Sequence, residues 1–336
     1  MKLKGYYNML DGYFPLYLTI FSISMIITVI LEKRLIPMLS ARARQPIYEV
    51  GPKWHMSKSG TPTMGGIAFL IAVSSALGLA VAFMLSRGLR DESVSLAVCG
   101  AFSLLNSAIG IIDDMTKLTR RQNAGLRPYQ KLIFQLATAI GFLVARHSLL
   151  GDDTAVSFAF GEVELGFLYY PMAIIILLGI VNCANLTDGI DGLASGVAFA
   201  VGISLFYISA ALVYDVAVIA AAIIGAAVGF LFFNIHPARI FMGDTGSLFF
   251  GALAVSAVFS LDNPLLVILI GGVYVLEGVS VILQVVAFKI TGKRIFKMAP
   301  VHHHLERCGM GENKICMIAI IATLVFSVPA FILYLP

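Results

Sequence analysis

Residues 15–31 read PLYLTIFSISMIITVIL and lead directly into Glu32, Lys33 and Arg34. A helix needs about 20 predominantly apolar residues to cross the hydrocarbon core of a bilayer, and the residues just beyond this run complete such a span. A cleavable signal peptide would end in small residues at a cleavage site, whereas this run ends in charged residues. The stretch therefore predicts a membrane-spanning helix that stays in the protein.

Runs of the same kind recur along the whole chain of 336 residues. Hydrophobic residues make up 59% of it and charged residues only 12%, which is about half the charged share of a soluble domain. No repeat or low-complexity segment divides the chain, so we predict a single all-α integral membrane domain over residues 1–336. The ten predicted transmembrane helices cover residues 15–35, 66–86, 94–112, 131–149, 168–185, 193–213, 215–233, 248–262, 264–287 and 315–335.

Basic residues are distributed unevenly between the two sides of this predicted domain. With ten spans both termini share one side, and most of the 23 lysines and arginines fall in loops on the other. Positive residues mark the cytoplasmic side, so we expect both termini outside. Residues 150–166 then lie outside, and their alternating apolar and polar side chains predict a small hairpin lid. The net charge of +4 is modest, and we expect no nucleic-acid partner.

Acidic residues gather in the loops predicted to be cytoplasmic. Asp113 and Asp114 follow the third span, and Asp244 precedes the eighth. Asp188 and Asp191 are three residues apart, a spacing that would place both on one face of a helix. Carboxylates are costly in lipid and are ligands that Mg²⁺ prefers, so the clusters predict a magnesium site facing one compartment. A solvated helix end and a glycine-rich turn are the competing interpretations.

Groups that suit phosphates share these loops. His302, His303 and His304 are consecutive and lie among basic residues, so they can donate hydrogen bonds to phosphates. Zinc binding is the weaker alternative, because no cysteine pair lies near them. Lys58 and nearby hydroxyls such as Thr63 can cradle a phosphate, although the spacing is not that of a P-loop. Acids and cations together predict phosphoryl transfer between a nucleotide and a lipid phosphate.

The ninth predicted span contains an adjacent glycine pair, Gly271 and Gly272, and the polar residue Glu277. Buried polar pairing between helices accounts for Glu277. A break in the helix that lines a lipid groove is the alternative interpretation.

Five motifs resemble those of the phospho-N-acetylmuramoyl-pentapeptide transferase family, within the polyprenyl-phosphate N-acetylhexosamine-1-phosphate transferase superfamily. They are KSGTPTMGG at 58–66, IDDMTK at 112–117, NLTDGIDGL at 185–193, FMGDTGS at 241–247 and PVHHHLE at 300–306. The resemblance covers essentially the whole chain. The first and last motifs favour this family over its amino-sugar relatives.

The resemblance implies a homodimer of the bacterial inner membrane with ten transmembrane helices and an active site on the cytoplasmic face. It also implies Mg²⁺-dependent transfer of phospho-MurNAc-pentapeptide from UDP-MurNAc-pentapeptide to undecaprenyl phosphate, which gives lipid I and UMP.

The resemblance assigns roles to residues by motif. The implied catalytic residues are Asp113, Asp114, Asp244 and His302. The implied Mg²⁺ ligands are Asp244 and Asp188. The implied substrate-binding residues are Lys58, Thr63, Lys131, Asn185, Asp188, Asp191, Asn234, Phe241, His303 and His304, with Phe241 stacked near uracil.

Two other functions are weighed against this one. A UDP-GlcNAc:polyprenyl-phosphate transferase would use the same Mg²⁺ chemistry. A transporter would place its coupling site near the bilayer midplane, whereas these acids gather at one interface.

Two mechanisms are also open. The lipid phosphate can attack directly with Asp113 as base, or an aspartate can attack first and form a covalent phospho-enzyme. We favour direct attack, because the lipid phosphate is already anionic near neutral pH.

Overall fold

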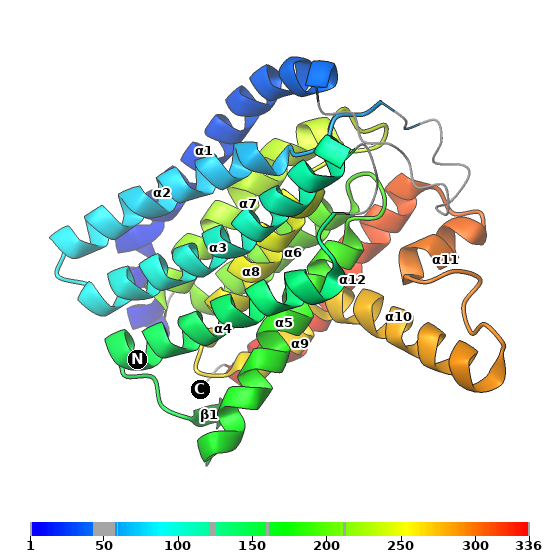
Figure 1. Cartoon of the computed structure of the whole chain (residues 1–336). Coiled ribbons are helices and arrows are strands. Elements are labelled where there is room, and N and C mark those ends of the chain that lie inside the picture. The colour runs from blue at the N-terminus through cyan, green and yellow to red at the C-terminus, as the bar shows by residue number, and fades with distance from the viewer. Residues whose placement is uncertain are drawn as a thin grey trace.

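The computed structural model describes residues 2–42, 58, 60–120, 125–158, 161–210 and 213–334, and it is a bundle of helices (Figure 1). Within this part, 8 helices are long and apolar enough to cross a membrane. They are α1 (Lys2–Arg42), α2 (Gly66–Ser86), α3 (Arg90–Arg120), α4 (Pro128–Leu150), α5 (Tyr169–Thr187), α7 (Tyr214–Asn234), α10 (Gly272–Thr291) and α12 (Glu312–Tyr334). The prediction of a helical integral membrane protein is confirmed.

Two further apolar helices, α6 (Leu193–Ser209) and α8 (Gly243–Phe259), have 17 residues each. They correspond to the sixth and eighth predicted spans, so the count of ten spans stays a prediction. Every residue of α8 from Thr245 to Phe259 is buried. Helix α8 packs mainly against α3 and α5, so protein rather than lipid surrounds it.

Close backbone contact joins α1 to α7. A Cβ atom added to Gly225 would lie 2.2 Å from the carbonyl oxygen of Phe21, and one added to Gly229 would lie 2.8 Å from that of Met25. Small residues four apart on one helix allow this approach, and they are typical of helix pairs in membranes. These two glycines therefore fix the distance between α1 and α7.

The ninth predicted span is broken in the structure. After the short η3 (Pro264–Leu266) and α9 (Val267–Ile270), the helix stops at Gly271, and α10 begins at Gly272. Helix α10 projects away from the bundle with α11 (Val301–Arg307) beside it (Figure 1). The break in the helix that one interpretation of this segment expected is therefore present. That the break lines a lipid groove stays a prediction.

The predicted hairpin of residues 150–166 is confirmed. Strands β1 (Ala155–Phe158) and β2 (Gly161–Glu164) pair antiparallel, with Val156 opposite Val163. Arg146 fastens this end of the bundle, because its Nε pairs with Asp152 and its Nη1 donates to Ser260 Oγ over 2.9 Å. In Figure 1 the hairpin and both marked termini lie at one end, and α11 lies at the other.

Candidate active site

Three aspartates meet where α8 begins against α3. Asp113, Asp114 and Asp244 each bring a carboxylate oxygen within 4.8 Å of the others. The third span was predicted to end at residue 112, but α3 continues to Arg120, so Asp113 and Asp114 lie within the helix and not at its end. Lys117 stabilises this polar extension by pairing with Asp113 over 2.7 Å, one turn away. Asp244 was expected in a loop but lies in the first turn of α8.

Asp114 acts as a side-chain cap for α8. Its carboxylate accepts hydrogen bonds from the backbone N–H of Asp244 at 3.1 Å and of Thr245 at 2.9 Å, and from the Thr245 hydroxyl at 2.7 Å. Gly110 makes this possible, since a Cβ there would lie 2.3 Å from the Asp244 carbonyl oxygen. A carboxylate at a helix N-terminus satisfies N–H groups that the helix itself cannot. The cap therefore fixes Asp244 relative to α3.

Two lysines and an asparagine surround Asp244. Its Oδ2 lies 2.9 Å from Lys131 Nζ and 3.2 Å from Lys117 Nζ. Asn185 donates to Asp244 Oδ1 over 3.0 Å and accepts from Lys131 over 3.0 Å. The structure thus brings together the predicted residues Asp113, Asp114, Lys131, Asn185 and Asp244. Lys117 was missed as a site residue, although its place three and four residues after the aspartate pair was a signal.

The pair Asp188 and Asp191 does not lie on a helix. Both residues belong to the turn between α5 and α6, so the prediction that they share a helix face was wrong. The turn forms because Gly192, at φ 78°, adopts a left-handed conformation before α6. Desolvation, followed by the charge of Asp244, raises the pKa of Asp188 to about 8. Asp188 thus lies within electrostatic range of the aspartate trio without belonging to it.

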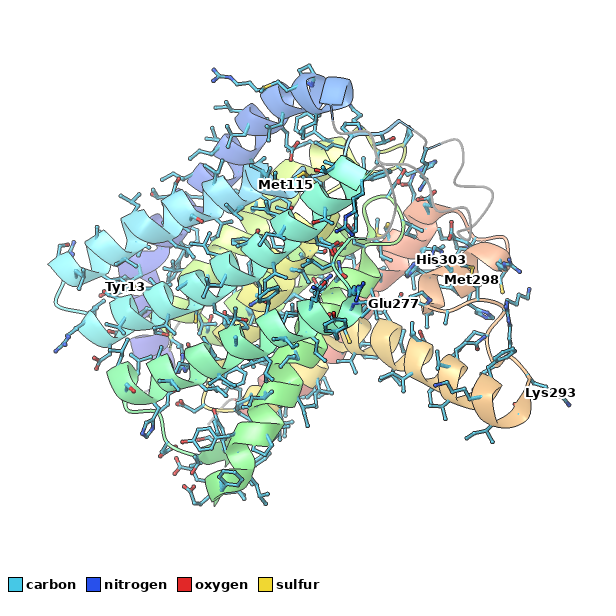
Figure 2. The ribbon with its side chains drawn as sticks, in the orientation of Figure 1. Tyr13, Met115, Glu277, Lys293, Met298 and His303 are labelled. Carbon is cyan, nitrogen blue, oxygen red and sulfur yellow. The ribbon has the colours of Figure 1, made fainter. Side chains whose placement is uncertain are left out.

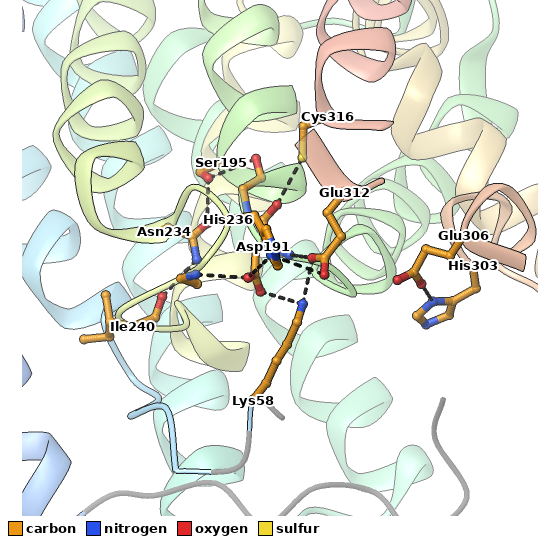
Figure 3. A network of polar contacts seen from close by, with 12 residues as sticks. Lys58, Asp191, Ser195, Asn234, His236, Ile240, His303, Glu306, Glu312 and Cys316 are labelled. Atoms are coloured by element: carbon orange, nitrogen blue, oxygen red, sulfur yellow. Dashed lines mark hydrogen bonds and ion pairs between the residues drawn. The ribbon is translucent and has the colours of Figure 1, made fainter. Parts of the chain in front are cut away.

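Asp191 belongs to a separate cluster (Figure 3). Its Oδ1 accepts from Lys58 Nζ over 2.7 Å, and its Oδ2 lies 2.9 Å from His236 Nδ1. Glu312, at the start of α12, accepts from the same lysine over 2.7 Å. Asp191, His236 and Glu312 have spacing that can hold a metal ion, but the Lys58 ammonium already places a positive charge between the two carboxylates. We call Lys58, Asp191, His236 and Glu312 the Asp191 cluster.

His236 and Glu312 were not predicted as site residues. His236 lies two residues after the end of α7, and Glu312 is the first residue of α12. Each was a polar residue at a helix end on the expected cytoplasmic side. No spacing within a motif linked them to Asp191.

Asn234 holds the turn that carries Asp191. Its Oδ1 accepts from Gly192 N over 3.1 Å and from Ser195 Oγ over 2.8 Å, and its Nδ2 donates to Ile240 O over 2.9 Å. The side chain is buried, and both its oxygen and its nitrogen take part in these contacts. The geometry therefore supports a positioning role for Asn234.

The first-loop motif and the FMGDTGS motif are joined through their backbones. Phe241 N donates to Pro62 O, and Phe241 O accepts from Gly65 N, both over 2.9 Å. Phe241 is itself partly exposed. Thr63 is buried, and its hydroxyl has no hydrogen-bond partner among the residues described by the structure. A Cβ on Gly243 would lie 3.0 Å from this hydroxyl and 2.5 Å from Asp114 Oδ2, so Thr63 borders the aspartate trio.

The three histidines of α11 have different surroundings. His302 is buried, with Nδ1 3.2 Å from Glu277 Oε2. Figure 2 shows Glu277 on α10 and His303 on the neighbouring α11. His303 Nδ1 lies 2.6 Å from Glu306 Oε2, and this pair is set apart from the Asp191 cluster in Figure 3. His304 Nδ1 accepts from Lys297 N over 3.1 Å, so His304 fastens the preceding loop.

His302 links α11 to the turn that carries both aspartates. A Cβ atom on Gly189 would lie 2.1 Å from His302 Nε2. The imidazole therefore fills the space that the glycine leaves, and Nε2 has no hydrogen-bond partner within the described part of the chain. The region as a whole offers carboxylates for a cation, ammonium groups for phosphates and the partly exposed Phe241.

The chain was compared with known families and proteins. The family described as glycosyl transferase family 4 matches residues 94–262, and phospho-N-acetylmuramoyl-pentapeptide-transferase signature 1 matches residues 58–70. The chain is 41% identical over 329 residues to a protein of Desulfitobacterium hafniense named phospho-N-acetylmuramoyl-pentapeptide-transferase, covering 94% of this chain and 96% of the relative. Proteins with this name from Halalkalibacterium halodurans (41% over 314 residues, 93% and 95%) and Clostridioides difficile (40% over 312 residues, 91% and 94%) are also similar.

The signature includes Lys58, which forms an ion pair with Asp191. The broader family match spans the three aspartates Asp113, Asp114 and Asp244. The match to the relatives extends over nearly the whole of each chain. With these residues gathered at one end of a bundle of membrane helices, the chain belongs to the phospho-N-acetylmuramoyl-pentapeptide transferase family and is a bacterial integral membrane enzyme.

Proposed function

We propose that this enzyme transfers phospho-MurNAc-pentapeptide from UDP-MurNAc-pentapeptide to undecaprenyl phosphate, giving lipid I and UMP as a step of peptidoglycan synthesis. The observation that carries the proposal is the aspartate trio, which lies beside Lys117 and Lys131. Phosphoryl transfer is catalysed mainly by positioning and by neutralisation of charge, and this arrangement offers both.

Mg²⁺ is the proposed cofactor. Asp244, Asp113 and Asp114 provide hard oxygen ligands close to one another. Asp188 adds to the acidic surroundings, and burial together with the nearby Asp244 charge raises its pKa to about 8, so a cation bound here would favour its ionised form. The buried Thr63 hydroxyl beside Asp114 is a polar group that still needs a partner. When bound, the metal would supply charge stabilisation for the reacting phosphates.

Asp113 and Asp114 differ in the role that they can take. Asp114 is committed to the N-terminus of α8, so it holds Asp244 in place. Asp113 is bound by Lys117 and by the N–H of Leu126, over 2.7 Å each, and has no such structural helix to cap. We therefore assign to Asp113 the handling of the acceptor phosphate. Direct attack by this phosphate on the donor's β-phosphate is the preferred path.

Other groups would hold the donor. Lys117 and Lys131 can neutralise a diphosphate, and Lys58, Asp191 and Phe241 would bind the nucleotide end. His302, His303 and His304 lie on α11 beside α10, whose outward surface carries exposed Ile282, Val286 and Ile290. This apolar surface is suited to the hydrocarbon chain of a lipid acceptor, with its phosphate at the aspartates.

The same proposal includes ten transmembrane spans, a homodimer and an active site on the cytoplasmic face.

An assay of UMP release tests the function. Purified full-length enzyme in detergent is supplied with undecaprenyl phosphate, Mg²⁺ and either UDP-MurNAc-pentapeptide or UDP-GlcNAc. Release of UMP with the first donor, and its loss when EDTA removes the metal, are expected. Activity with UDP-GlcNAc and none with UDP-MurNAc-pentapeptide would overturn the donor assignment. Full activity in EDTA would overturn the proposed Mg²⁺ dependence. A phosphorylated aspartate trapped from donor alone would contradict direct attack.

A further inference from the structure

A carboxylate outside all five motifs lies at the centre of the Asp191 cluster. Glu312, in the first turn of α12, accepts through one oxygen, Oε2, from both Lys58 Nζ at 2.7 Å and the backbone N–H of Asp191 at 2.8 Å. It therefore joins three parts of the chain that are distant in sequence: the loop before α2, the turn before α6 and the last helix. Figure 3 shows Lys58 rising from its loop toward Asp191 and Glu312.

A second contact from the same helix supports this junction. Cys316 lies one turn after Glu312, and its thiol donates to the carbonyl oxygen of Asp191 over 3.1 Å. Helix α12 thus binds both backbone polar groups of Asp191. The side chain of Asp191 is 3% exposed, and these two contacts fix the backbone from which it extends.

The cluster opens toward solvent on one side. His236 is 43% exposed, whereas Lys58 is 15% exposed and Glu312 is 11% exposed. A polar ligand that approaches past His236 meets Lys58, and this lysine is held by both Asp191 and Glu312. Removal of Glu312 would leave the flexible Lys58 stem with one anchor and the Asp191 N–H without its acceptor.

We propose that Glu312 is a positioning residue for the nucleotide donor, acting through Lys58 and Asp191 without touching the substrate. The identity of that substrate rests on the proposed function. A positioning residue of this kind sets the affinity for one substrate and leaves the chemical step intact. Its loss changes the KM for the donor and has little effect on kcat or on the KM for the lipid acceptor.

Steady-state kinetics of Glu312→Gln, which keeps the shape and removes the charge, test the proposal. A lost hydrogen bond to a charged group predicts a rise of about tenfold or more in donor KM, with acceptor KM and kcat within about threefold of the wild type. Glu312→Asp keeps the charge and should recover part of the affinity. Glu162→Gln, an exposed change on the hairpin at the other end, is the matched control and should leave all three constants unchanged.

A double-mutant cycle with Lys58→Met decides whether Glu312 acts through the lysine. Residues that share a contact give non-additive effects, so the rise in donor KM of the double variant should be clearly smaller than the product of the two single rises. Additive effects, equal changes in both KM values, or a fall in kcat alone would each overturn the proposal. If the wild type releases no UMP from UDP-MurNAc-pentapeptide, the proposed function fails. The cycle is then measured from unfolding temperatures, where additive shifts would overturn the junction itself.

Discussion

Asp244 is held between two ammonium groups and is fixed from behind by the cap that Asp114 makes on α8. At the scale of single residues, Asp244 is the carboxylate that the surrounding polar side chains hold in place. Asn at this position would keep the size and the helix but would remove the negative charge. The Lys117 and Lys131 ammonium groups would then lose their shared partner.

We expect Asp244→Asn to lower kcat by more than about a hundredfold, because the proposed function makes Asp244 a direct Mg²⁺ ligand and its loss should exceed the usual effect of changing a surrounding residue. UMP release at saturating Mg²⁺ measures this. The variant should still be extracted from the membrane as a folded protein, which gel filtration in detergent checks. Substantial retained turnover at saturating Mg²⁺ would remove Asp244 from the catalytic assignment.

Gly189 gives a second prediction at this scale. A methyl group there would lie 2.1 Å from His302 Nε2, so Gly189→Ala must displace either α11 or the turn between Asp188 and Asp191. Misplacement of about 1 Å can cost about a hundredfold in rate, and we expect a loss of that order in kcat/KM. Gly179→Ala on α5 is the control, since its added methyl group meets nothing within 4 Å. Equal activity of the two variants would show that the contact has no effect.

The sequence predicted the residue types of the site better than their grouping. Asp113, Asp114 and Asp244 were expected together because all three lie at one predicted interface, and the structure brings them together. Asp191 was expected beside Asp188, but the turn directs it toward Lys58 and Glu312 instead. A spacing of three residues predicts a shared face only if the segment is helical. Here Gly189 and Gly192 favour a turn.

At the scale of helices, the boundaries show what hydropathy measures. An apolar run ends where the membrane ends, but a helix ends where its backbone hydrogen bonds do. Helix α3 therefore runs on to Arg120, past the last apolar residue of its predicted span. The ninth predicted span differs from its helix in the opposite way. Its apolar pattern continues through Gly271, but the helix stops there. Glycine lowers the cost of such an interruption.

The contact of α1 with α7 gives a prediction at the scale of helices. Gly225→Ala would push the added methyl group against the Phe21 carbonyl, and we expect the folded state to lose about 1–3 kcal/mol. The melting temperature in detergent should fall accordingly. Gly78→Ala on α2, where the added methyl meets nothing within 4 Å, is the matched control. An unchanged melting temperature for Gly225→Ala would mean that the two helices can separate without cost.

At the scale of the whole molecule, native cysteines can report which end faces the cytoplasm. Cys308 is exposed just after α11, whereas Cys99 and Cys316 are buried and Cys183 is partly buried. A membrane-impermeant maleimide should label the protein in inverted membrane vesicles and not in intact cells. Cys308→Ser should abolish the labelling. Labelling in intact cells would place the site on the outer face and contradict the distribution of lysine and arginine.

Helix α8 has a consequence for how the protein is made. It is shorter than the roughly 20 residues that cross a bilayer unaided, and it is surrounded by α2, α3, α5, α6 and α7, its main helical neighbours. All five precede it in the chain, and synthesis proceeds from the N-terminus. The ribosome therefore synthesises the five surrounding helices before it synthesises α8. Asp244, in the first turn of α8, can therefore reach Asp113 and Asp114 only after all five neighbouring helices have been synthesised.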